Sequence, residues 1–175
     1  MPEQTLTVKT PLQIAIITIS DSRTEDNDKS GKILVHRLQK AGHSLAHKAI
    51  IPDNIYAIRA EISALILNNN IQAVITTGGT GLTGRDVTPE AIQPLYDKEI
   101  TGFGEVFRMI SYDLIKTSTV QSRAIAGIAN GTPIFSLPGS PGACKDGWDS
   151  IISHQLNIDH KPCNLVEIMP RFLEK

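Results

Sequence analysis

Apolar residues in the first half of the chain alternate between short continuous runs and helical spacings. The continuous run at 12–20 predicts a strand that is buried on both faces, as inside a parallel sheet, and 44–51 and 71–77 are predicted as the second and third strands. Between the strands, apolar residues recur every three or four positions. This spacing predicts one helix that Ser30 caps and Gly42 ends, and another from Pro52 to about position 67. The order β-α-β-α-β is typical of a parallel sheet covered by helices.

The second half of the chain continues this pattern and adds a hairpin. Thr88-Pro89 predicts a capped helix start, and 103–115 predicts a further helix. Its inward side chains are expected to be Val106, Phe107, Ile110 and Leu114. Asn130-Gly131 lies between two apolar segments, 123–129 and 132–137, and predicts a β-hairpin. The fold class is therefore a three-layer α/β/α architecture with a mostly parallel central sheet and a β-hairpin in the C-terminal half.

Composition and charge narrow the class of protein. We expect one domain over 12–164, between an N-terminal tail at 1–11 and a C-terminal tail at 165–175. The net charge of −1 gives no general attraction to nucleic acid or to a membrane surface. Residues 1–13 lack a hydrophobic signal core, and no apolar run is long enough to span a bilayer. Two distant cysteines fit a reducing compartment, so we expect a cytoplasmic protein.

The most informative segment is the glycine-rich loop at 78–86, which follows a β-branched strand. Glycines at 78, 79, 81 and 84 allow backbone N–H groups to approach an anion closely. The loop ends in Arg85-Asp86, which adds a cation for a phosphate and a carboxylate for a metal or a proton. These features predict a phosphate-handling site at the carboxyl ends of the strands, where the loops at 20–30, 51–54 and 78–88 are expected to face one crevice.

Two familiar glycine motifs do not account for this loop. Its GxGxxG spacing follows the third strand rather than the first, and the next helix begins only near Pro89, which argues against a dinucleotide fold. A P-loop needs Lys-Ser/Thr where this chain has Arg85-Asp86. A simple tight turn would need only one or two glycines.

A second loop, 138–142, also joins a strand to a helix. Ser140 is expected to cap that helix and Pro141 to form its first turn, which leaves N–H groups and a helix dipole for an anion. Taken alone, this loop is better explained as an ordinary capped turn. The two loops together favour a ligand with more than one anionic group.

Two carboxylates beside the predicted phosphate site suggest Mg²⁺ held by oxygen ligands. Asp53 and Asp86 are the candidates, although Asp53 could cap a helix and Asp86 could brace its own loop. Glu105 and Arg108 are one turn apart and form either a solvated ion pair or part of a site. The five histidines show no metal-ligand spacing.

Together, these motifs resemble the MoaB/MogA family of molybdenum cofactor biosynthesis proteins, which share a fold with the G domain of gephyrin. The resemblance covers about 12–164, and the sequence is more similar to the MoaB branch than to the MogA branch. The matching stretches are DSRTEDNDKSG, IIPDN, TTGGTGLTGRDVTPEA, GFGEVFRMIS, QSRAIAGIANGT and SLPGSPGAC.

The resemblance implies a role in molybdenum cofactor biosynthesis. It implies that the protein binds molybdopterin and adenylylates it with Mg-ATP. Asp53 and Asp86 would be catalytic and would hold Mg²⁺. The substrate-binding residues that it implies are Gly78, Gly79, Thr80, Gly81, Glu105, Ser122, Arg123, Gly139, Ser140 and Pro141. It also implies a homo-oligomer, a hexamer rather than a trimer.

Two other functions remain open. The first is a molybdopterin carrier or regulator without catalysis, which the joint presence of Asp53 and Asp86 disfavours. The second is a nucleotide-binding or hydrolase domain from another pathway, which would hydrolyse ATP without any pterin.

Overall fold

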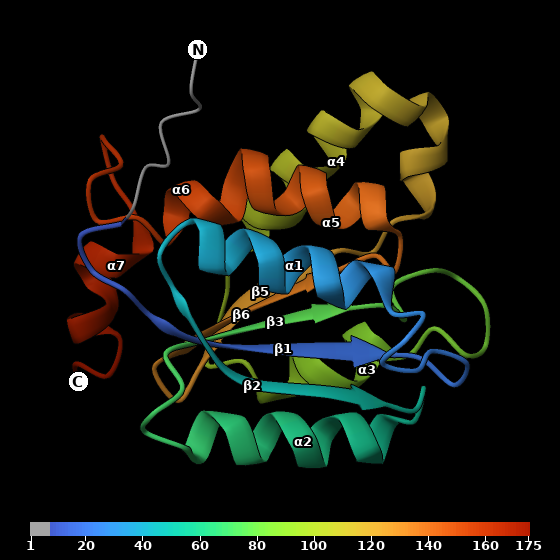
Figure 1. Cartoon of the computed structure of the whole chain (residues 1–175), viewed down its shortest axis with the longest axis horizontal. Coiled ribbons are helices and arrows are strands. Elements are labelled where there is room, and N and C mark those ends of the chain that lie inside the picture. Colours follow the sequence, from blue (N-terminus) through green and yellow to red (C-terminus); the bar gives the residue numbers. More distant parts are fainter. Residues whose placement is uncertain (1–7) are drawn as a thin grey trace.

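A computed structural model describes residues 8–175 and shows a single sheet between two helical layers (Figure 1). The strands are β1 (Gln13–Ile19), β2 (Ser44–Ile51), β3 (Ala73–Thr77), β4 (Lys98–Glu99), β5 (Ile125–Ala129) and β6 (Thr132–Leu137). The longer helices are α1 (Lys29–Lys40), α2 (Ile55–Leu67) and α4 (Thr101–Ile115). The shorter helical elements are α3 (Thr88–Ile92), α5 (Pro141–Gly147), α6 (Ser153–Gln155), α7 (Leu165–Ile168), the 3-10 turns η1 (Gln93–Leu95), η2 (Lys116–Gln121) and η4 (Met169–Arg171), and the π-helical turn η3 (Trp148–Ile152).

The six strands form one mostly parallel sheet in the order β2-β1-β3-β6-β5-β4. Strands β2, β1, β3 and β6 are parallel, whereas β5 and β4 are antiparallel to their neighbours. The chain moves outward from β1 to β2 and then returns to β3 on the other side of β1. This reversal opens a crevice at the carboxyl ends of β1 and β3, where ligands collect in such sheets.

Helices cover both faces of the sheet and divide the core into two layers. In Figure 1, α1, α4, α5 and α6 lie on one face, and α2 and α3 lie on the other. Alternate residues of β1 serve the two cores: Ile14 and Ile16 pack under α1, while Ala15 and Ile17 pack against α2. The predicted three-layer α/β/α class is therefore confirmed. No helix within 8–175 combines the length and apolarity that crossing a membrane requires.

The predicted hairpin is present, and its turn explains its sequence. Strands β5 and β6 pair antiparallel around Asn130-Gly131, with Ala129 opposite Thr132. Asn130 and Gly131 both have positive φ, 47° and 76°, as a two-residue type I′ turn requires. The short edge strand β4 was not predicted from the sequence.

Three predicted helix starts were wrong in detail. Asp28, not Ser30, caps α1, because its carboxylate accepts the Gly31 N–H at 2.9 Å. Asn54, not Asp53, caps α2. Thr88 begins α3 without capping it. Asp28 and Asn54 supply the capping oxygens of α1 and α2, which leaves Ser30 and Asp53 for other contacts, and no side chain caps α3.

The predicted inward face of α4 was also wrong. Phe103, Phe107 and Ser111 are buried, whereas Val106 and Leu114 are 40% and 61% exposed. Phe107 was predicted correctly, and Ile110 is partly buried against the same core. The helix is rotated because Phe103 and Phe107 stack on each other and Phe103 packs edge-on against Phe135 of β6.

The expected tails contribute to the structure wherever it describes them. Most of the N-terminal tail lies outside the described residues, but Val8 is buried and its N–H bonds to the carbonyl of Ala41. At the other end, α7 and η4 occupy part of 165–175. Val166 is 7% exposed there and belongs to the core between the sheet and α1.

Candidate functional site

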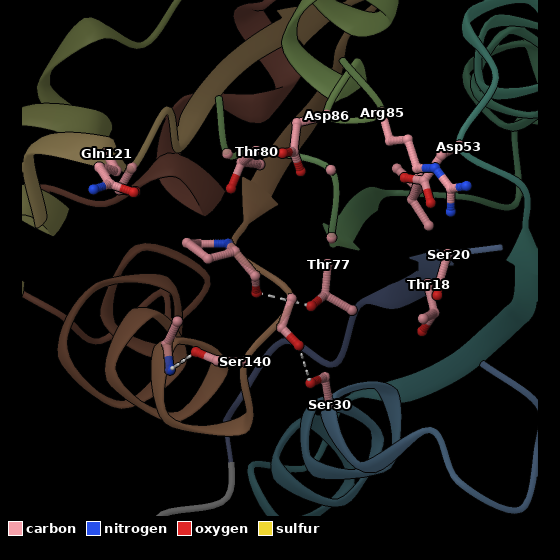
Figure 2. Close-up of a pocket in the computed structure, with 18 of the residues that line it drawn as sticks. Thr18, Ser20, Ser30, Asp53, Thr77, Thr80, Arg85, Asp86, Gln121 and Ser140 are labelled. Carbon is pink, nitrogen blue, oxygen red and sulfur yellow. Dashed lines mark hydrogen bonds between the residues drawn. The ribbon is translucent and has the colours of Figure 1, made fainter. Parts of the chain in front are cut away.

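A cavity of about 530 Å³ lies at the carboxyl ends of β1, β3 and β6 (Figure 2). Ser20 and Ser22 after β1, Asp53 after β2 and the glycine loop after β3 all line it. This confirms that the loops at 20–30, 51–54 and 78–88 face one crevice. Its volume lies within the range of small-molecule sites in proteins.

The backbone of the glycine loop has a conformation that requires glycine. Gly78 has φ +109°, and a Cβ there would lie 2.2 Å from the carbonyl oxygen of Ile19. Gly79 has φ +69°, and a Cβ there would lie 2.3 Å from Oγ1 of Thr88. Residues with side chains rarely adopt these angles. The loop therefore passes closer to β1 and α3 than any other residue type would allow.

The carbonyl groups of this loop are engaged on the side away from the cavity. Thr88 Oγ1 donates to the oxygen of Gly78 at 2.8 Å, and the Thr88 N–H donates to that of Gly79. The Arg123 N–H donates to Thr80, and Arg123 Nε donates to Gly81 at 2.8 Å. These contacts fix the loop without using the space above it.

Asp86 braces the loop and also lines the cavity. Its carboxylate accepts hydrogen bonds from the Thr83 N–H at 2.9 Å and from the Thr83 hydroxyl at 2.7 Å. Burial alone would raise the pKa of Asp86. The Thr83 bonds, a backbone bond from Gly81 and the nearby charge of Arg123 outweigh burial and lower it. Asp86 therefore remains ionised at neutral pH.

Asp53 lines the same cavity as Asp86 and is held by Asp21. The Asp21 N–H donates to Asp53 Oδ2 at 3.1 Å, and the Asp53 N–H donates to Asp21 Oδ1 at 3.0 Å. Burial, followed by the charges of Asp21 and Asp86, raises the pKa of Asp53, against the backbone bond from Asp21 and the Arg85 charge, which lower it. Arg85 approaches Asp21 to 3.9 Å and is largely exposed at the mouth.

These oxygen donors suit a magnesium ion that is shared with a phosphate ligand. Among the described residues, no three His, Cys, Asp or Glu side chains gather into a metal site of their own. Mg²⁺ commonly takes only one or two carboxylates from a protein and completes its shell with substrate phosphates and water. Asp53 and Asp86, which line the same cavity, fit that arrangement.

The second loop follows β6 and closes the cavity from the opposite side. Ser140 caps α5, as predicted, by accepting the Ala143 N–H at 3.2 Å. Ser30 Oγ donates to the carbonyl of Gly139 at 2.9 Å, and Thr77 Oγ1 donates to that of Pro138 at 3.0 Å. Figure 2 shows these bonds beneath the loop. Both donors line the cavity themselves, so these bonds fix the second loop at the cavity wall.

The structure gathers most of the expected site residues around this cavity. Those that line it are Asp53, Gly78, Gly79, Thr80, Gly81, Asp86, Ser122, Gly139 and Ser140. Among the described residues, Glu105, Arg123 and Pro141 are absent from the lining. Glu105 is exposed on α4, and Arg123 is turned behind the glycine loop.

The hydroxyl-bearing and amide residues of the cavity wall were not predicted from the sequence. Thr18, next to last in β1, and Thr77, last in β3, are buried under the loops. Ser118, Thr119 and Gln121 come from η2 and form the rim beyond α4. A threonine at or next to the end of each of two apolar strands was the available signal. The rim residues carry no local pattern.

Comparison with known proteins of similar sequence identifies the family of this chain. The family described as "Probable molybdopterin binding domain" matches residues 15–157. Molybdenum cofactor biosynthesis protein B of Escherichia coli strain K12 is 53% identical over 154 residues, which cover 88% of this chain and 91% of that protein. The protein of the same name from Bacillus subtilis is 44% identical over 142 residues, 81% of this chain and 84% of that one.

Solved structures support the same assignment. A crystal structure of a molybdenum cofactor biosynthesis protein B has a TM-score of 0.84 at 40% identity and covers 93% of this chain and 96% of its own. The tungsten cofactor synthesizing protein MoaB from Pyrococcus furiosus has a TM-score of 0.74 at 40% identity, covering 83% and 92%. The chain therefore belongs to the MoaB/MogA family of molybdopterin-binding domains, as its motifs predict.

Proposed function

We propose that this protein binds molybdopterin and adenylylates it with Mg-ATP as a step in molybdenum cofactor biosynthesis. The observation that carries the proposal is the meeting of two anion-binding loops with Asp53 and Asp86 around one cavity. Membership of a molybdopterin-binding family supports the choice of ligand. The two phosphate-bearing substrates account for two loops better than a single anion does.

The proposed reaction is a nucleotidyl transfer. A terminal phosphate oxygen of molybdopterin attacks the α-phosphorus of ATP and forms a new P–O–P bond. The bond from the α-phosphorus to the bridging oxygen breaks, and its electron pair leaves with pyrophosphate. The attacking phosphate is already ionised at neutral pH, so no strong general base is required.

The role of the protein is then to orient two anions and to offset their repulsion. The glycine loop and the N-terminus of α5 would bind phosphate oxygens through backbone N–H groups. Mg²⁺ held by Asp53 and Asp86 would supply positive charge between the two phosphate groups. Arg85, largely exposed at the mouth beside Asp21, would turn toward ATP.

An adenylylation assay tests this proposal. Purified protein is mixed with molybdopterin, ATP and Mg²⁺, and adenylylated pterin is followed by chromatography. We expect Asp86→Asn to lower turnover about 100-fold, as is common when transition-state charge stabilisation is lost. Asn keeps an oxygen that can accept the Thr83 bonds, so pterin binding should change little. Asp26→Ala, an exposed change in the β1–α1 loop, is the control.

A molybdopterin carrier or regulator is the second candidate, and one observation favours it. The bonds of Asp86 to Thr83 are a sufficient structural reason for that carboxylate. Tight pterin binding without product from the wild type would establish this function instead. ATP hydrolysis without pterin would indicate a nucleotide hydrolase.

We also propose that the protein assembles into a homo-oligomer, a hexamer rather than a trimer. The support is an apolar surface on the outer side of α4 and η2. Its exposed side chains are Val106, Met109, Tyr112, Leu114, Ile115 and Val120. Large exposed apolar patches commonly mark interfaces. Sedimentation at several protein concentrations tests this, and a monomer throughout would contradict it.

A further inference from the structure

The carbonyl groups of residues 78–81, the first part of the glycine loop, are all engaged from one side. Thr88 binds the first two: its hydroxyl donates to Gly78 O at 2.8 Å, and its N–H donates to Gly79 O at 3.0 Å. Thr88 is fully buried and lies outside the cavity lining. The first half of the loop is therefore anchored to the start of α3.

Arg123 binds the other half of the loop. Its N–H donates to Thr80 O at 3.0 Å, and its Nε donates to Gly81 O at 2.8 Å. Its Nη2 donates to Asp86 O at 2.7 Å, and its Nη1 pairs with the carboxylate of Glu90. All three guanidinium nitrogens are thus used behind the loop. Little capacity remains for a ligand in the cavity.

Because the peptide bond is planar, the bonds to these carbonyls also fix the directions of the N–H groups that follow them. In a trans peptide the N–H of a residue points opposite to the carbonyl of the residue before it. With the carbonyls of Gly78 and Gly79 bound behind the loop, the N–H groups of Gly79 and Thr80 point the other way, toward the cavity. Neither N–H has a hydrogen-bond partner among the described residues. Gly81 differs, because the Asp86 carboxylate lies beside it: a Cβ on Gly81 would be 2.7 Å from Asp86 Oδ2.

We propose that Arg123 is a positioning residue that, with Thr88, holds the carbonyls of the glycine loop back so that the N–H groups of Gly79 and Thr80 bind the phosphate. Arg123 does not contact molybdopterin in this arrangement. The identification of the phosphate as that of molybdopterin rests on the proposed function. The direction of the Gly79 and Thr80 N–H groups and their support by Thr88 and Arg123 do not depend on it. The resemblance to the family had suggested a pocket position for Arg123.

An arginine suits this task better than a lysine. Its planar fork donates along several fixed directions at once, whereas an ammonium is a single compact charge on a flexible stem. Here the fork joins Gly81 and Asp86 on either side of the loop tip while Glu90 balances its charge. Lys at this position would keep the charge but lose the simultaneous bonds.

Phosphate titration followed through backbone amide NMR signals tests the inference, with inorganic phosphate as the probe. In the wild type, the amides of Gly79 and Thr80 should shift on binding. Arg123→Lys should weaken phosphate binding about tenfold, since Lys cannot form the simultaneous bonds that hold the loop. Arg59→Lys is the matched control, because Arg59 also binds two carbonyls, those of Glu90 and Ala91, but none in the loop.

Thr88 provides a second, smaller change in case Arg123→Lys impairs folding. Thr88→Val keeps the shape and removes the hydroxyl that binds Gly78 O, so phosphate affinity should fall. Thr88→Ser keeps the hydroxyl and should restore affinity. If the role of Thr88 were purely structural, Thr88→Val and Thr88→Ser would differ in thermal midpoint, but the two folded proteins would have the same phosphate affinity. That result would overturn the inference.

Turnover separates this inference from the proposed function. Where adenylylation is observed, Arg123→Lys should raise KM for molybdopterin about tenfold and change kcat less than about threefold, as expected for loss of binding common to ground and transition states. A wild type that binds phosphate at Gly79 and Thr80 but makes no product would refute only the proposed function. Equal phosphate affinity in Arg123→Lys and Arg59→Lys, or no amide shift in the wild type, would refute the positioning role.

Discussion

The two loops over the cavity place different demands on the backbone. In the glycine loop, Gly78 and Gly79 have positive φ and leave no room for a Cβ. In the loop after β6, a Cβ on Gly139 would lie 3.3 Å from the Cα of Gly78, and one on Gly142 would meet nothing within 4 Å. The first loop has a conformation that only glycine adopts readily. The second is a capped helix start.

This difference separates two ways of presenting N–H groups to an anion. The loop after β6 relies on the free N–H groups that any helix has at its start, so one cap and one proline are sufficient. The glycine loop is not helical, and its N–H groups must be turned by positive φ and by bonds from Thr88 and Arg123. Changes in the glycine loop should therefore be more damaging than matched changes in the second loop.

Gly78→Ala should have the largest effect. The new Cβ would require positive φ in a non-glycine residue and would meet the carbonyl of Ile19 at 2.2 Å. We expect the free energy of unfolding to fall by about 3 kcal/mol or more. Urea denaturation followed by circular dichroism measures this.

Gly142→Ala is the control for that change in the second loop. Gly142 lies in the first turn of α5 with open space around it, so Ala should stabilise the protein slightly, by up to about 1 kcal/mol. If the two alanine variants had similar stability, the contrast between the loops would be wrong.

Ser140→Ala should have an intermediate effect. It removes the side-chain oxygen that accepts the Ala143 N–H, and loss of an N-cap costs about 1 kcal/mol. Ser140→Asp, which keeps an acceptor, should retain most of the stability in the same urea experiment. A loss as large as that of Gly78→Ala would show that the second loop is as constrained as the first.

Much of the fold was predictable because its signals are local. The β-branched runs predicted β1 and β3, the segment 44–51 was recognised as β2, and Asn130-Gly131 predicted the β5–β6 turn. The errors arose where neighbours compete for one task. Asp28 and Ser30 can both cap α1, and only the contact of Ser30 with Gly139, 109 residues away, shows why Asp28 does so. The rotation of α4 likewise depends on Phe135, far along the chain.

The site was predictable to the same extent. Glycines and carboxylates that follow strand ends can be recognised from sequence, and the parallel topology brings them together. The supports behind them cannot be recognised in this way. Arg123 reaches Gly81 across 42 positions, and no spacing rule shows whether its guanidinium faces a ligand or a carbonyl. The resemblance suggested that Arg123 belongs to the site, but only its contacts show that the guanidinium points toward the loop carbonyls.

The smallest expected effect is a pH dependence within the glycine loop. The folded-state pKa of Asp86 is lowered, because bonds from Thr83 and Gly81 and the charge of Arg123 outweigh burial. Its ionised form therefore stabilises the fold above the unfolded pKa of about 3.9, and this contribution is lost as the pH falls through the lowered folded value. Because the carboxylate is partly solvated, the contribution should stay below about 1 kcal/mol.

Comparing stability against pH for the wild type, Asp86→Asn and Thr83→Val isolates this contribution. The advantage of the wild type over Asp86→Asn should be constant near neutrality and should shrink as the pH falls below about 4. Thr83→Val removes only the hydroxyl bond, so its pH-dependent loss should be smaller but have the same sign. If the wild type instead lost stability relative to Asp86→Asn as the pH rose, burial would be the dominant influence on the pKa of Asp86. The carboxylate would then add strain to the loop, and the bonds behind the loop from Thr88 and Arg123 would have to hold it alone.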